Sequence, residues 1–318
     1  MGAIAGSSLL DCQPSAALDT VTLTVNNACN LSCPHCYLQY DQAASTPFDV
    51  EIFPLIERST FRHLAIVGKE PLFDKHSLQL CLAVAEICQK SGKTISLITN
   101  GLNLSAVPDS FFEVFSFIDI SLDGGMNTYS EYRKGSIAKL RKSLDRLGNQ
   151  KVPFNALHVL NSATFGSFDD LLAVRAMAPF QRIVFSPYIE TANHGTNTVG
   201  PVALESILHR LRDSTFVQTV GAVLLVHDEH LRQARMPEAL FAQLATEYGI
   251  SDNLCFIPAD PVDYGVVRVT FDGLVLTPYA ALHPRHYAAQ AHFRVSELRD
   301  TTLQSAFTRL REENQSIQ

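Results

Sequence analysis

Short β-branched runs alternate with helical patterns along most of this chain, and no other feature constrains its fold as strongly. The first run is Val21 to Val25, followed by a helical pattern from Ile52 to Phe61. Later helical patterns include Asp109 to Phe115 and Phe168 to Met177. The sixth run is Ile183 to Pro187, followed by a helix around Leu204 to Leu211. Such repeated strand-helix units predict a parallel sheet, either an open doubly wound sheet or a barrel closed fully or in part. Ligands of both architectures bind at the carboxyl ends of the strands.

The alternation ends near Gly221, where one apolar strand and two helical patterns lead to a hairpin signal. This signal is Asp272-Gly273, which supplies the positive φ angles of a tight antiparallel turn between two apolar runs. A last amphipathic helix is expected from Leu303 to Arg311. We therefore predict a tail at residues 1–19, a strand-helix core at 20–230, and a further domain that contains the hairpin at 231–318.

The composition narrows the class of protein and its partners. With 318 residues, 46% of them hydrophobic, the chain can bury a core without disulfides. Its net charge of -7 repels a phosphate backbone, so we expect no nucleic-acid partner. No apolar run reaches the roughly 18 residues of a membrane span, and no export signal is evident, so we expect no membrane partner. Seven cysteines, an odd number, fit a reducing compartment, and we expect the cytoplasm.

Three cysteines lie within eight residues directly after the first predicted strand. They are Cys29, Cys33 and Cys36, in the pattern C-x3-C-x2-C. Thiolates this close in one loop can ligate a metal centre from one side, and three of them leave a four-iron cluster with one iron lacking a protein ligand. Such an open iron is a site for chemistry.

This motif and three later segments resemble the signature of the radical S-adenosylmethionine (radical SAM) enzymes. The second strand ends in Gly68-Lys69-Glu70-Pro71, similar to the family's G-G-E-P segment with Lys69 in place of the second glycine. The third strand ends in Thr99-Asn100-Gly101, and the fourth in Ser121-Leu122-Asp123-Gly124, followed by Arg133. The resemblance covers roughly residues 20 to 190 and rests on four elements at successive strand ends.

The resemblance implies an α/β fold with a partial (β/α)6 TIM-like barrel and a C-terminal α+β extension that contains a β-hairpin. It also implies one [4Fe-4S] cluster, S-adenosylmethionine (SAM) as second cofactor, and an electron donor such as flavodoxin or ferredoxin. A reduced cluster would cleave SAM to a 5′-deoxyadenosyl radical that abstracts hydrogen from the substrate, a small natural-product intermediate or a peptide. The implied residues are Cys29, Cys33 and Cys36 for the cluster; His35 and Tyr37 near the adenine; Gly68, Lys69 and Glu70 at the methionine amino group; and Asn100, Ser121 and Arg133 at the ribose and carboxylate.

Three other interpretations of these motifs stay open. Cys33 and Cys36 alone form the C-x-x-C of a thiol-disulfide oxidoreductase, although the third thiol and the number of strand-helix units argue against it. A structural zinc site would need a fourth ligand from elsewhere in the chain. Lys69 in the cofactor-facing segment raises the alternative of a cluster-binding partner protein without catalysis.

The C-terminal part resembles the SPASM or twitch domains of this family in outline but lacks the cysteines for an auxiliary cluster. Cys255 precedes the hairpin, and Pro278 and Tyr279 stand where the next thiol is expected. One thiol cannot hold a cluster. Cys255 is either a buried apolar thiol or, as in radical epimerases, the donor of a hydrogen atom to a substrate radical.

The other cysteines and a group of histidines suggest no second site. Cys81 and Cys88 lie on the apolar face of one predicted helix and are expected in the core. His283, His286 and His292 are expected at the surface rather than in a metal site.

Overall fold

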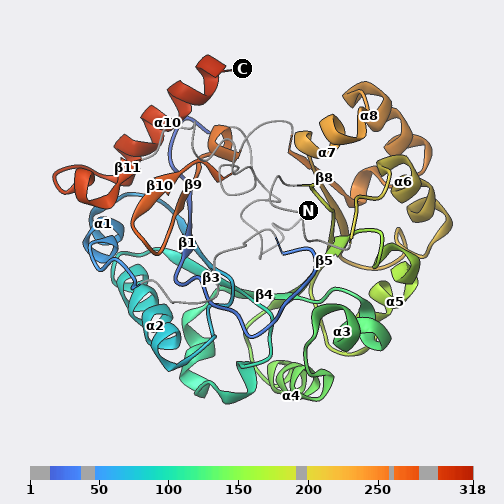
Figure 1. The fold of residues 1–318 in the computed structure, drawn as a ribbon, viewed down its shortest axis with the longest axis horizontal. Helices are drawn as coiled ribbons and strands as arrows, with labels where there is room; N and C mark the ends of the chain where they lie inside the picture. The colour runs from blue at the N-terminus through green and yellow to red at the C-terminus, as the bar shows by residue number, and fades with distance from the viewer. Residues whose placement is uncertain (1–14, 37–46, 191–198, 258–260, 279–292, 318) are drawn as a thin grey trace.

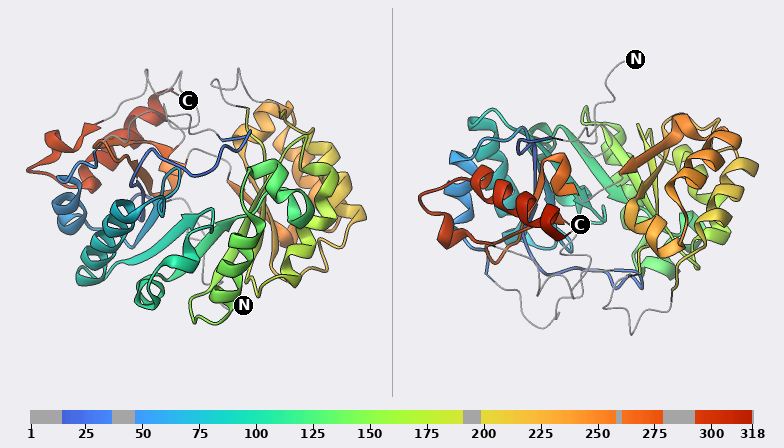
Figure 2. Two further views of the ribbon diagram at one scale, coloured as in Figure 1. Left: turned by 60° about the horizontal axis from the view of Figure 1, so that its bottom comes forward. Right: turned by 90° about the horizontal axis from the view of Figure 1, so that it is seen from above.

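The described part of the chain forms one continuous sheet with helices on its outer side (Figure 1). The computed structural model describes residues 15–36, 47–190, 199–257, 261–278 and 293–317. Within these residues the sheet has 11 strands in the order β11-β10-β9-β1-β2-β3-β4-β5-β6-β7-β8. The helices form a ring around the strands that is interrupted between α10 and α8, and both views of Figure 2 show the strands inside this ring.

Six strand-helix units build the first part, as the alternation of the sequence predicts. All neighbouring pairs from β1 to β6 are parallel, which confirms the α/β class and the partial TIM-like barrel. The elements are β1 (Thr20–Thr24), α1 (Ile52–Arg58), β2 (His63–Val67), α2 (Lys75–Lys90), β3 (Thr94–Thr99), η1 (Leu104–Ala106), η2 (Asp109–Val114), β4 (Phe117–Ser121), α3 (Gly125–Arg133), α4 (Ile137–Gly148), β5 (Phe154–Leu160), η3 (Phe165–Ser167), α5 (Phe168–Leu172), η4 (Ala173–Ala176), β6 (Ile183–Pro187) and α6 (Leu204–Asp213).

Two of the predicted helices are wholly or partly 3₁₀ helix. The predicted helix at 109–115 is the 3₁₀ helix η2, and the one at 168–177 is α5 continued by η4. Segment 109–114 has Phe at two of its six positions and follows Pro108, so its propensity for a long α-helix is low. Both segments still bury apolar side chains, Phe111 and Phe168 among them.

The strand-helix rhythm continues beyond Gly221, further than the sequence pattern indicates. Strand β7 (Ala222–His227), helices α7 (Asp228–Ala234) and α8 (Glu238–Glu247), η5 (Ser251–Asn253) and strand β8 (Leu254–Ile257) extend the sheet, with β6, β7 and β8 parallel. Strand β8 was not predicted, because four apolar residues give no clear period. Thus the parallel part of the barrel continues past residue 230.

The C-terminal hairpin is built onto the other edge of the barrel. After η6 (Pro261–Tyr264), β9 (Val266–Val269) and β10 (Leu274–Leu276) are antiparallel, as Asp272-Gly273 predicts. Of these two residues only Gly273 has a positive φ, +78°. Strand β9 also pairs in parallel with β1, so the hairpin continues the same sheet. Strand β11 (Phe293–Arg294), η8 (Val295–Leu298) and α10 (Leu303–Ile317) complete the structure.

The first described residues dock against this C-terminal part. The Asp19 backbone N–H donates to Gly265 O at 2.8 Å, and the Leu18 N–H donates to the side chain of Gln304 at 2.9 Å. Residues 15–19 therefore bridge the first strand to the last helix. No helix among the described residues has the length and apolarity that a membrane span requires.

Candidate functional site

The three motif cysteines lie in the loop that leaves β1 at the carboxyl edge of the parallel strands. All three side chains are partly buried. The Leu31 N–H donates to Cys29 Sγ at 3.3 Å, and the Cys36 N–H donates to Cys33 O at 3.2 Å, which closes a turn between the last two cysteines. The loop therefore holds its thiols by its own backbone.

Burial acts on two of these thiols. Burial raises the pKa of Cys33 to about 11 and also raises the pKa of Cys29. Reactive C-x-x-C thiols have lowered pKa values, so the oxidoreductase alternative loses support. The nearby Arg133 guanidinium acts in the opposite direction and favours both thiolates.

The three cysteines lie near one another without forming a compact group of ion ligands. Among the residues that the structure describes, no three His, Cys, Asp or Glu side chains are arranged to hold one ion. The thiols of Cys29, Cys33 and Cys36 nevertheless interact electrostatically with one another. Their assignment as the ligands of a four-iron cluster stays a prediction.

The segment after β2 is held by the loop after β1. Gly68 has a φ of +155°, a conformation that favours glycine, and Lys69 follows it at the half-buried rim. Asn26 Nδ2 donates to Glu70 O at 2.8 Å and to Ser77 Oγ at 2.9 Å, the latter in the first turn of α2. Asn26 thus ties the segment to the strand that precedes the cysteine loop.

The Glu70 carboxylate accepts hydrogen bonds from three donors of the protein itself. Its Oε1 accepts from Thr99 Oγ1 at 2.6 Å and from the Leu72 N–H at 3.0 Å, and its Oε2 accepts from the Asn100 N–H at 2.8 Å. The side chain is 1% exposed, and burial raises its pKa, which the three donors oppose. Glu70 therefore joins the ends of β2 and β3, and its direct contact with a methionine amino group stays a prediction.

Asn100 and Ser121 occupy the ends of the next two strands. Asn100 Nδ2 donates to Asn30 Oδ1 at 2.7 Å and lies 3.9 Å from Cys29 Sγ, so this side chain contacts the cysteine loop. Ser121 is the last residue of β4 and is half-buried. The structure brings both residues to the edge where the cysteines lie.

Arg133 and His35 meet at one carboxylate that the sequence analysis did not assign to the site. Asp123 Oδ2 lies 2.5 Å from Arg133 Nη1 and 3.1 Å from His35 Nε2. Its Oδ1 accepts from the Val159 N–H at 2.6 Å. Although burial opposes it, the charges of His35 and Arg133 hold the pKa of Asp123 below its usual range. The motif Ser121-Leu122-Asp123 indicated a functional strand end, but only the fold shows that Asp123 contacts His35 and Arg133.

A second contact fixes the same histidine. The Tyr132 hydroxyl lies 2.8 Å from His35 Nδ1 and 2.5 Å from Asn161 Nδ2. Asn161 is the first residue after β5. Both ring nitrogens of His35 are therefore occupied. Tyr132 and Asn161 were missed because polar residues at these positions have no motif.

Two buried polar atoms of this edge have no partner among the described residues. One is the donor Arg133 Nε and the other is the acceptor Asn26 Oδ1. A Cβ built on Gly68 would lie 3.4 Å from this Asn26 oxygen, so the acceptor faces the segment expected at an amino group. The Arg133 donor, on a cation, suits a carboxylate, and the Asn26 acceptor suits an ammonium group. The residues present therefore fit the two ends of a methionine zwitterion.

Cys255 lies on β8 and faces the interior of the barrel. It pairs in register with Leu225 of β7, while the neighbouring Phe256 contacts Phe241 of α8 with ring centroids 5.6 Å apart. Successive side chains of a strand point to opposite faces, so Cys255 points away from the helices. It is partly rather than fully buried.

The remaining predicted residues divide into confirmed core residues and residues outside the described ranges. Cys81 and Cys88 are both 0% exposed, which confirms their place in the core. Tyr37, Tyr279, His283, His286 and His292 lie outside the described residues, as does the tail before residue 15.

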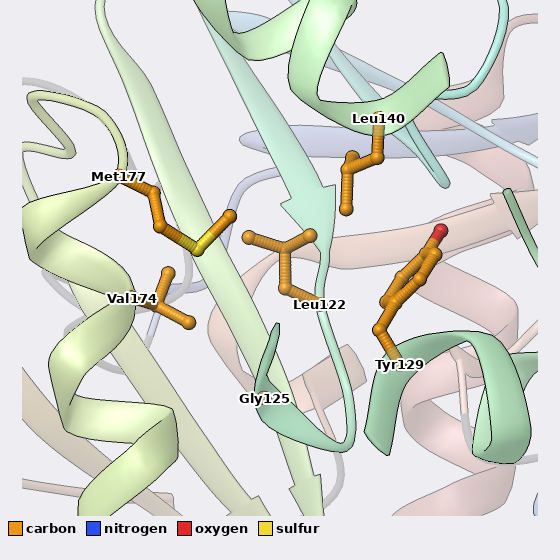
Figure 3. A pocket seen from close by; sticks show the side chains of 6 residues that line it. All are labelled: Leu122, Gly125, Tyr129, Leu140, Val174 and Met177. Carbon is orange, nitrogen blue, oxygen red and sulfur yellow. The ribbon is translucent and has the colours of Figure 1, made fainter. Parts of the chain in front are cut away.

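An apolar pocket is lined in part by α3 (Figure 3). Its lining carries no charged side chain, so it suits no SAM or cluster. It lies between the end of β4 and the helices outside it, and its lining residues are Leu122, Gly125, Tyr129, Leu140, Val174 and Met177.

Comparisons with known proteins agree on the fold. No family model matches the chain. A curated relative, the sporulation killing factor maturation protein SkfB of Bacillus subtilis (strain 168), is 24% identical over 162 residues, which are 48% of this chain and 38% of SkfB.

Solved structures of Streptococcus suis SuiB are similar over most of the chain. The structure of SuiB bound to its precursor peptide SuiA is 14% identical in sequence and superposes with a TM-score of 0.64. The alignment covers 92% of this chain and 65% of SuiB. SuiB bound to SAM gives a TM-score of 0.57 over 89% of this chain and 65% of SuiB. A structure of anSMEcpe with AdoMet and the Cp18Cys peptide is 16% identical with a TM-score of 0.52, covering 81% of this chain and 74% of that protein. The chain thus spans about two fifths of SkfB and just under two thirds of SuiB.

Proposed function

We propose that this chain, which has the fold of the radical SAM enzymes that its motifs resemble, is itself a radical SAM enzyme. The observation that carries the proposal is the convergence of four strand ends on the three-cysteine loop. Asn100 and Arg133 lie within 4 Å of the thiols of Cys29 and Cys33, respectively. Sequence spacing alone could not bring these residues together, whereas adjacent parallel strands do.

Cys29, Cys33 and Cys36 would hold a [4Fe-4S] cluster through three of its irons. Such a cluster, with SAM bound beside it, would supply the electron for reductive cleavage of SAM and so start radical chemistry on a substrate. The chain supplies a partly buried loop and a buried guanidinium beside the thiols. Burial keeps water and oxygen away from the reacting atoms.

The walls around the cysteines would orient SAM by its charged ends. Arg133 Nε, buried and without a partner among the described residues, would donate to the methionine carboxylate. Asn26 Oδ1 and the backbone of Gly68 and Lys69 would meet the amino group. Glu70 would fix this segment, while Ser121 and Asn100 would border the ribose. His35 and Tyr37 would lie near the adenine.

The substrate class that we favour is a peptide. SkfB is named as a maturation protein, and the SuiB and anSMEcpe structures hold a precursor peptide and the Cp18Cys peptide. A small natural-product intermediate is the alternative. A flavodoxin or ferredoxin would deliver the electron. Residues 231–318 would form a degenerate SPASM or twitch domain without an auxiliary cluster.

The first experiment is anaerobic reconstitution with iron and sulfide, followed by reduction with dithionite and measurement of 5′-deoxyadenosine from SAM. We expect about four irons per chain and 5′-deoxyadenosine. Cys36→Ala should abolish both, and Cys81→Ala is the matched control because Cys81 is 0% exposed in the core. An iron-free protein would overturn the proposal. A protein with a cluster but no SAM cleavage would instead favour the non-catalytic partner.

A second candidate is a radical epimerase in which Cys255 donates a hydrogen atom. Its position on the interior face of β8 favours this reaction over a purely structural thiol. The Cys255 S–H bond would break, its hydrogen atom would pass to a substrate carbon radical, and a thiyl radical would remain for an external reductant to quench. Cys255→Ala should leave 5′-deoxyadenosine formation intact and stop substrate turnover. Unchanged product formation would refute the role.

A further inference from the structure

We propose that Asp123 is a positioning residue that couples the cysteine loop to Arg133. One carboxylate oxygen holds both His35 of the loop and the guanidinium at the end of α3. This inference rests on the proposed function, because it assigns Asp123 a part in placing the cluster loop beside the SAM carboxylate.

The carboxylate is shared among three elements. Oδ2 lies 2.5 Å from Arg133 Nη1 and 3.1 Å from His35 Nε2, while Oδ1 accepts from the Val159 N–H of β5 at 2.6 Å. The Asp123 side chain is 2% exposed and that of Arg133 is 8% exposed. Charge-assisted hydrogen bonds in such a site are stronger than those at a surface. A movement of the Asp123 carboxylate would therefore break at least one of these contacts.

Arg133 also contacts the cysteine loop directly. The sulfur of Cys33 lies 3.9 Å from the Arg133 carbonyl oxygen. A shift of Arg133 would therefore move the end of α3 against one of the proposed cluster ligands. Arg133 Nε, which is buried and has no partner among the described residues, is the donor that would meet the SAM carboxylate. Because Asp123 takes Nη1, it also sets the direction of Nε.

Tyr132 holds the opposite side of the same imidazole. Its hydroxyl lies 2.8 Å from His35 Nδ1, and it is the neighbour of Arg133 in α3. The two nitrogens of the His35 ring thus face two different partners, Nε2 the Asp123 carboxylate and Nδ1 the Tyr132 hydroxyl. The ring between Cys33 and Cys36 is thus fixed from both nitrogens, which would hold the loop in place before any cluster is bound.

The test measures the cysteine loop of the full chain before any cofactor is added. Wild-type, Asp123→Asn and Asp119→Asn apoproteins are treated anaerobically with iodoacetamide, and each cysteine is followed by mass spectrometry. Asp119 is the matched control: it is a buried carboxylate within β4, the strand that precedes Asp123, and it accepts from Asn155 Nδ2 at 2.8 Å. In Asp123→Asn we expect alkylation of Cys33 and Cys36 to rise about tenfold, the equivalent of one lost charge-assisted bond. Cys81 and Cys88 should stay protected.

Equal alkylation of Cys33 and Cys36 in wild-type and Asp123→Asn would overturn the proposal. So would an equal rise in Asp119→Asn. If Cys81 and Cys88 become reactive, the variant has unfolded, and Tyr132→Phe replaces it. This variant removes only the hydroxyl, so we expect an increase of about threefold at Cys36, and an unchanged rate there would refute the coupling.

A second measurement separates this inference from the proposed function. After reconstitution, Asp123→Asn should bind SAM about tenfold more weakly than wild-type in equilibrium titrations, and the electron paramagnetic resonance spectrum of its reduced cluster should respond less to SAM. Wild-type protein that takes up no iron would refute the proposed function and leave the alkylation result as the test of the coupling. An active wild-type and an Asp123→Asn variant with unchanged SAM affinity would refute the role of Asp123 alone.

Discussion

Replacing Glu70 by Gln tests how the second strand end is held. The carboxylate accepts from Thr99, Leu72 and Asn100, and its Oε2 faces the Asn100 N–H at 2.8 Å. A glutamine can keep Oε1 as an acceptor for the first two donors. Its NH2 group then faces the Asn100 N–H, which loses its acceptor inside the protein. An unsatisfied buried donor costs about 1–3 kcal/mol, and relief of the buried charge offsets part of this.

We expect Glu70→Gln to lower the free energy of unfolding by about 2 kcal/mol. With an unfolding entropy of about 2.1 cal/mol/K per residue over 318 residues, this corresponds to a Tm about 3 °C lower. The assay is urea and thermal unfolding of the apoprotein followed by circular dichroism. Glu86→Gln is the control, because Glu86 is exposed and pairs only with Lys90 on the same helix. A Glu70→Gln protein as stable as wild-type would refute the assignment of Glu70 as the link between β2 and β3.

Three further predictions concern the fold. Burial raises the pKa of Asp119 to about 7 from 3.8, so the folded state binds this proton more tightly than the unfolded state. This contribution to the free energy of unfolding is complete below about pH 4 and is lost as the pH rises through 7. The midpoint of urea unfolding should therefore fall over this pH range in wild-type and fall less in Asp119→Asn. Parallel pH profiles of the two proteins would contradict the prediction. Gly221→Ala should cost at least about 2 kcal/mol, since φ is +74° and the new Cβ would lie 2.3 Å from Gln181 O, whereas Gly166→Ala, with no neighbour within 4 Å, should change stability by less than about 0.5 kcal/mol. Phe307→Ala, a 0% exposed position in α10, should lower stability by about 3–5 kcal/mol in one cooperative transition, and two transitions would indicate that residues 231–318 unfold separately.

Local patterns predicted the elements whose cause is local. The parallel strands follow from repeated apolar runs, and the β9–β10 turn follows from Asp272-Gly273, because only a few residues have low-energy positive φ angles. The cysteine loop was found from its spacing alone. The four-residue strand β8 was missed, because so short a run has no measurable period.

Contacts between distant segments could not be predicted in this way. Asp123 binds His35, 88 positions earlier in the chain, and its partner Val159 lies 36 positions later. Nothing in the neighbourhood of any one of these residues specifies the others. The pairing of β9 with β1 is of the same kind, since it depends on how the barrel closes.

This pairing has a consequence for biosynthesis. Thr22 Oγ1 donates to Val267 O across 245 positions, so one flank of β1 has no neighbour until the ribosome has made β9. Contacts of such long range form slowly, because the intervening loop must close first. A nascent chain that lacks β9 would therefore present its three cysteines to iron and sulfide beside an incomplete sheet.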